Sequence, residues 1–83
     1  MTATSSALSK NQRERIKRRI VAIEAEISSL EDEVAKLTVE MASPAIAGEY
    51  EKFQAVSGKV QENQARIQSL YEEWDAKSAE LPV

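Results

Sequence analysis

The chain has no cysteine and no histidine among its 83 residues. Without cysteine it can form neither a disulfide framework nor a cysteine-ligated metal site. Without histidine it lacks the commonest general base and metal ligand. It has only two glycines, which excludes the glycine-rich loop that holds nucleotide phosphates. We therefore predict that this chain is no enzyme and has neither a cofactor nor a metal site.

Long apolar runs are also missing. No stretch approaches the length of a membrane span, and no signal-peptide pattern precedes the first predicted helix. We therefore expect no membrane partner and take the cytoplasm as the expected location. The short length allows one domain at most.

The start of the chain predicts a long helix after an unstructured leader. Residues 1–8 are small and unpatterned, and we expect a disordered leader or linker there. Ser9 and Gln12 have the spacing of a capping box, in which each side chain bonds the other residue's backbone N–H. The first helix is expected at about residues 10–42.

A proline near the middle of the chain predicts a connection between two helices. Pro44 cannot continue the first helix, while Ser43 and Pro44 together favour a short helical turn within the connection 43–48. The second helix is expected at about residues 49–79. The predicted domain then spans 9–81.

Apolar residues recur in alternating steps of three and four along both helices, which is the heptad pattern of a coiled coil. The first set occupies core positions a and d at Ile16, Ile20, Ile23, Ile27, Leu30, Val34, Leu37 and Met41. The second set is Phe53, Val56, Val60, Asn63, Ile67, Leu70 and Trp74. We call each set a seam. Two seams joined by a short connection predict an all-α, antiparallel two-helix coiled-coil hairpin.

Reversing the chain about position 45 pairs seam residues whose numbers add to ninety. The expected layers are Leu37 with Phe53, Val34 with Val56, Leu30 with Val60, Ile27 with Asn63, Ile23 with Ile67, Ile20 with Leu70, and Ile16 with Trp74. The flanking g positions then join opposite charges: Glu40 with Lys52, Glu33 with Lys59, Glu26 with Arg66, and Arg19 with Glu73. Core and flank therefore predict the same register.

Charge is distributed unevenly. Residues 1–19 hold six basic side chains and one acidic one, a net charge of +5, whereas residues 20–83 hold five basic and thirteen acidic ones, a net charge of −8. The six basic residues are Lys10, Arg13, Arg15, Lys17, Arg18 and Arg19. A helix end surrounded by positive charge suits a nucleic-acid phosphate backbone, and these six are the predicted binding residues. Solubility is the other interpretation.

Other polar and aromatic residues allow two interpretations each. Clustered carboxylates suit acid–base or metal chemistry, but a rod without a pocket favours a solvated surface. Asn63 within the seam has two interpretations: it contacts a ligand, or it destabilises alignments in which one helix has slipped along the other. In the second case Gln64 beside it can share its hydrogen bonding. Phe53 and Trp74 could stack on bases, yet their seam positions favour core packing. Tyr71, at an e position, is expected to be half exposed.

Several short segments carry a family resemblance over about residues 8–81. They are Leu-Ser-Lys-x-Gln-Arg-Glu (8–14), Glu-Ala-Glu-Ile (24–27), Ser-Pro (43–44), Tyr-Glu-Lys-Phe (50–53) and Leu-Tyr-Glu-Glu-Trp (70–74). In this order they resemble the C-terminal coiled-coil domain of ABC-F ATPases, soluble ABC proteins with two nucleotide-binding domains. The Uup-like branch is the most similar.

The resemblance implies an accessory domain attached to a cytosolic ATPase that acts on ribosomes or nucleic acid. The domain would bind DNA or ribosomal RNA, with the parent's ATPase domains in cis. The alternative is a protein-interaction or spacer coiled coil without nucleic-acid binding. Self-association of hairpins is compatible with either function.

Overall fold

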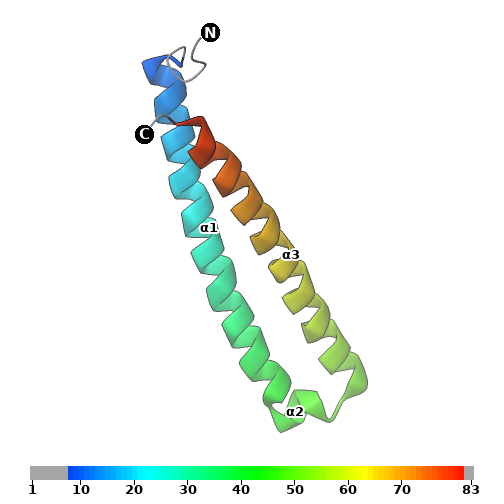
Figure 1. The fold of residues 1–83 in the computed structure, drawn as a ribbon. Coiled ribbons are helices and arrows are strands. Elements are labelled where there is room, and N and C mark those ends of the chain that lie inside the picture. The colour runs from blue at the N-terminus through cyan, green and yellow to red at the C-terminus, as the bar shows by residue number, and fades with distance from the viewer. Residues whose placement is uncertain (1–7, 82–83) are drawn as a thin grey trace.

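The computed structural model describes residues 8–81, so the predicted leader lies almost entirely outside the described residues. Three helices follow one another in the described part: α1 (Lys10–Ala42), α2 (Pro44–Ala47) and α3 (Tyr50–Glu80). α1 and α3 pack against each other along their length, and α2 closes one end (Figure 1). The prediction of an all-α hairpin with a helical turn in its connection is confirmed.

The helix ends follow the local sequence. The Ser9 hydroxyl accepts a 3.0 Å bond from the Gln12 N–H, and the Gln12 side-chain oxygen accepts a 2.8 Å bond from the Ser9 N–H, so the capping box is confirmed. Ser43 precedes α2, but its side chain makes no capping bond there. Its backbone N–H donates to the Glu40 carbonyl at 3.0 Å and closes the last turn of α1.

The core lies between the two long helices, and every residue of both seams is buried or half-buried. Its most protected part is a cluster of Ile23, Ile27 and Leu70, against which three further residues pack: Leu30, Ile67 and Trp74. Ile23 and Leu70 are 0% exposed. Full burial of such side chains is worth about 1.5–3 kcal/mol each, so this cluster stabilises the hairpin most.

The membership of this cluster differs from the predicted layers. The predicted register sets Leu70 opposite Ile20, which is not among the residues packed on the cluster. Leu70 instead packs with Ile23 and Ile27.

A hydrogen bond across the hairpin also excludes the predicted layers. The Tyr71 hydroxyl donates to a Glu31 carboxylate oxygen at 3.3 Å. In the predicted register these residues would be offset by twelve positions, about 18 Å along the axis, which is beyond the combined reach of the side chains. α3 is therefore shifted along α1, so that the numbers of facing residues add to more than ninety.

The connection explains the shift, because the chain changes direction on both sides of α2. Ser43, before α2, is extended with φ −72° and ψ 146°. After α2, Gly48 is right-handed helical with φ −85°, and Glu49 is extended with φ −121° and ψ 109° before α3 begins. The reversal therefore extends from Ser43 to Glu49 and is centred beyond position 45. Each residue of that displacement adds two to the sum of the numbers of facing residues.

Two of the four predicted flanking ion pairs form. Arg19 binds Glu73 and Arg66 binds Glu26, each through two hydrogen bonds. Within residues 8–81 the predicted pairs of Glu40 with Lys52 and Glu33 with Lys59 are absent, and Lys52 instead lies 3.3 Å from Glu49. Both pairs that form use arginine, whose planar guanidinium makes two hydrogen bonds to one carboxylate, and lysine lacks that two-bond geometry.

The two ends of the hairpin are uneven. In Figure 1 the blue start of α1 projects past the red end of α3. Gln12, Arg15 and Ile16 nevertheless line one hollow together with Lys77 of α3, so only the first turn of α1 lies beyond α3.

Asn63 lies in the core without a hydrogen bond from its amide nitrogen. Its side-chain Nδ2 is buried and has no hydrogen-bond partner among the described residues. Gln64 is exposed and supplies no such partner. The amide therefore costs stability, because a buried donor without a partner loses its hydration.

Replacing Asn63 with Leu should raise the free energy of unfolding by about 1–2 kcal/mol, because an apolar layer replaces the unpaired amide. Chemical denaturation followed by circular dichroism measures this change. Gln64→Leu, at the exposed neighbouring position, should have a much smaller effect. A destabilised Asn63→Leu would show that the amide has a partner in solution.

Replacing Gly58 with Ala should also stabilise the hairpin, by about 0.5–1 kcal/mol, because glycine within a helix carries an entropic cost. A Cβ built at Gly58 meets nothing within 4 Å. The matched control is Gly48→Ala, whose Cβ would lie 3.2 Å from the Pro44 carbonyl oxygen and should give little or no gain. Equal thermal stabilisation by both substitutions would contradict the described turn.

Candidate nucleic-acid interface

The six predicted binding residues form one continuous region, the basic end, over the first three turns of α1. They are Lys10, Arg13, Arg15, Lys17, Arg18 and Arg19. Arg13 and Arg19 are half-buried, and the other four are exposed. The helix begins at Lys10 because of the Ser9 cap, so the whole basic end is held in helical geometry.

Local bonds hold some of these side chains. Lys17 Nζ lies 3.9 Å from a Glu14 carboxylate oxygen, and both side chains are about half exposed. Arg18 Nε donates to the Glu14 carbonyl at 3.4 Å, and Arg13 donates to the Leu8 carbonyl at 3.4 Å. These contacts are long and at most partly buried, so they hold the side chains weakly and leave their charge available to a ligand.

Arg19 is held more firmly than the other five. Its Nε and one terminal nitrogen both lie 2.7 Å from oxygens of Glu73. The hydrogen bond from Arg19 lowers the pKa of the Glu73 carboxyl, and the same bond raises the pKa of Arg19. Arg19 is therefore chiefly a link between α1 and α3.

Helical geometry separates the basic end into two faces. Lys10, Arg13 and Lys17 share a sector about 60° wide, whereas Arg15 and Arg19 point to the opposite side. The second face adjoins a notch of about 350 Å³ lined by Gln12, Arg15, Ile16, Arg19 and Lys77. Lys77 comes from the last turns of α3 and brings a third cation to this notch.

Lys77 was not predicted from the sequence. It lies seven residues after Leu70 and so continues the core spacing of the second seam, but its partner residues depend on the register. Its Nζ is 4.0 Å from Glu80, and 34% of its side chain is exposed. The heptad position was visible in the sequence, but its proximity to Arg15 and Arg19 was not.

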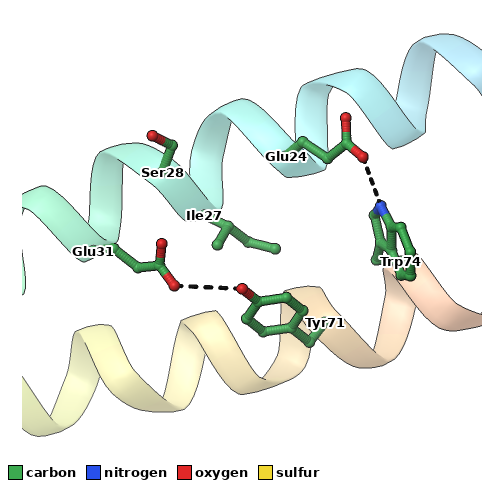
Figure 2. A pocket seen from close by; sticks show the side chains of 6 residues that line it. All are labelled: Glu24, Ile27, Ser28, Glu31, Tyr71 and Trp74. Atoms are coloured by element: carbon green, nitrogen blue, oxygen red, sulfur yellow. Dashed lines mark hydrogen bonds between the residues drawn. The ribbon is translucent and has the colours of Figure 1, made fainter.

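A second hollow, the acidic groove, lies further along the hairpin. It has a volume of about 290 Å³ and is lined by Glu24, Ile27, Ser28, Glu31, Tyr71 and Trp74. Figure 2 shows Tyr71 and Trp74 on α3 reaching towards the two glutamates on α1. The Trp74 indole N–H donates to Glu24 at 3.0 Å, and the negative charge of Glu31 raises the pKa of Tyr71. Tyr71 is 46% exposed, which confirms the prediction for it.

The described part of the chain shows neither a metal-ligand cluster nor a membrane-spanning helix. Residues 8–81 contain no cluster of carboxylates that could hold a metal ion. None of the described helices is both long and apolar enough to cross a membrane.

Comparison with protein families identifies the fold. The family model for the ABC transporter C-terminal domain matches residues 8–76. The chain belongs to this family. The match spans the basic end and the acidic groove of this C-terminal domain, while Lys77 follows its last residue. Comparison with curated proteins and with solved structures gives no significant match.

The Arg19–Glu73 pair should make the domain's stability depend on pH. The pKa of Glu73 is lowered on folding from its ordinary value of 4.5. Its stabilising contribution is therefore present above that value and is lost as the pH falls through the lower, folded-state pKa. The melting temperatures of the wild type and Glu73→Gln should differ most near neutral pH and converge in acid.

Glu62→Gln is the matched control, because Glu62 is exposed and forms no side-chain hydrogen bond or ion pair within residues 8–81. The difference in melting temperature between this variant and the wild type should stay small at every pH. A difference for Glu73→Gln that persists unchanged in strong acid would contradict a charge-dependent link.

Proposed function

We propose that this chain is the nucleic-acid-binding accessory domain of a soluble ABC-F ATPase of the Uup-like branch. The basic end contacts the phosphate backbone of DNA or ribosomal RNA. The family membership supports attachment to an ABC protein, whose ATPase domains lie in cis. The branch is inferred from the short segments, above all Leu-Tyr-Glu-Glu-Trp at 70–74.

The observation that carries the proposal is the uneven end of the hairpin. The first turn of α1 projects past the end of α3, so the cations at the start of α1 can approach a nucleic acid from several sides. Net charge changes from +5 in residues 1–19 to −8 in residues 20–83, which concentrates the attraction for phosphates at this end. The acidic remainder repels the backbone and orients the rod end-on.

The notch strengthens this electrostatic attraction. Arg15 and Lys77 come from different helices and line one hollow together with Arg19, so cations converge there on a single concave surface. Clefts lined by charge of one sign concentrate the field towards an ion of the opposite sign. Arginine can bind a phosphate with two parallel hydrogen bonds. No side chain of this set reads base edges, so binding should be almost independent of sequence.

The direct test is binding to fluorescent duplexes of unrelated sequence over a salt series. Wild type should bind all of them similarly, with affinity falling steeply as salt rises. Arg15→Gln with Arg18→Gln removes two phosphate contacts and should reduce the slope of log affinity against log salt by about 2. The control is Lys36→Gln with Lys59→Gln, which removes the same charge from two exposed positions elsewhere on the rod.

The control variant should bind nearly as well as wild type. Absence of binding by wild type at low salt would reject the nucleic-acid function and favour the protein-interaction or spacer hairpin. Equal losses of affinity in the two double variants would show that net charge alone attracts the nucleic acid, without a localised interface.

A further inference from the structure

The acidic groove carries charge that the hairpin does not neutralise. Glu24 and Glu31 bond only to Trp74 and Tyr71 there, and no cation within residues 8–81 forms an ion pair with either. Two carboxylates flanking the exposed Tyr71 ring and the half-buried Trp74 ring form a site for a cationic side chain, because the rings attract cations as well. The chemistry of the groove therefore selects arginine or lysine.

The same face of α1 also carries the matching cations. Lys10, Arg13, Lys17, Glu24 and Glu31 all lie within a sector about 60° wide. Lys10 and Lys17 are seven residues apart, as are Glu24 and Glu31, so both pairs have a spacing of about 10.5 Å. One stripe of α1 is thus cationic over its first half and anionic over its second half.

We propose that two copies of this domain associate antiparallel, each inserting its Lys10–Arg13–Lys17 face into the acidic groove of the other. The two-fold axis passes between residues 20 and 21. Lys17 of each copy then meets Glu24 of the other, Lys10 meets Glu31, and Arg13 lies between the carboxylates over Tyr71 and Trp74. A two-fold interface must use one self-complementary surface, and this stripe satisfies that condition only when antiparallel.

Two further observations fit this arrangement. The start of α1 projects past the end of α3, so the start of each α1 can lie along the other copy's groove as a third helix. Val21 is 64% exposed and lies beside the proposed axis, where the two copies bring their valines together. Arg15 and Arg18 point away from this face, and association leaves them free for phosphate.

Sedimentation velocity over a concentration series at low ionic strength tests association directly. Wild type should pass from monomer to dimer and return to monomer as salt is added, because charge pairs dominate the interface. The domain's sole tryptophan, Trp74, lies in the groove, so its fluorescence should change over the same concentration range. A wild type that stays monomeric at every concentration overturns the proposal.

Charge-swapped variants make the test specific. Variant A carries Glu24→Lys and Glu31→Lys, and variant B carries Lys10→Glu and Lys17→Glu. Each alone should remain monomeric, since like charges would face each other in its dimer. A mixture of A and B should form a one-to-one dimer, because both halves of the interface regain opposite charges. Failure of the mixture to associate, with both variants helical by circular dichroism, contradicts the proposed pairing.

Two controls separate this proposal from other functions of the same surfaces. Arg15→Gln with Arg18→Gln should dimerise like wild type, whatever its effect on nucleic acid. If it abolishes dimerisation, the proposed face is wrong. If wild type is monomeric but an added arginine-rich peptide alters Trp74 fluorescence, the groove takes a foreign basic segment and the second-copy assignment is rejected.

Discussion

Packing of Ile23 and Ile27 against Leu70 fixes how far one long helix is shifted along the other. The layer is the driest part of the hairpin, with Ile23 and Leu70 fully buried. Sliding the helices by a heptad would keep apolar residues facing each other but would remove these particular contacts. The alignment in turn determines which residues of α1 project beyond α3 and which aromatic rings meet which carboxylates.

The fold was predictable because a heptad pattern constrains helix type and helix face at every residue. The capping box at Ser9 and the break at Pro44 located the helix ends. The register was not predictable from the same pattern, because apolar residues can still face each other when one helix slides along the other. The decisive detail was local: the chain changes direction at Ser43 and again at Gly48 and Glu49, on both sides of α2. A short helical turn was expected there, but its effect on the centre of reversal depends on backbone angles that the heptad pattern does not specify.

The candidate site also has one part that the sequence predicts and another part that it does not. The basic end is a run of nearby residues on one helix, and its location follows from the sequence alone. Lys77 and the acidic groove depend on which turns of α3 lie beside which turns of α1, so they required the register. In the predicted alignment Tyr71 would lie beside Arg19, and no groove with Glu31 could form. A correct fold class therefore left the two hollows of the hairpin undetermined.

The register is best measured through Trp74, whose indole resonances are unique in the nuclear magnetic resonance spectrum because the chain has one tryptophan. In spectra of the nuclear Overhauser effect, the packing of Trp74 on the core cluster predicts contacts from the Trp74 ring to the methyl groups of Ile23. Contacts from that ring to Ile16, without any to Ile23, would restore the alignment about position 45. They would also remove the basis for the projecting basic end.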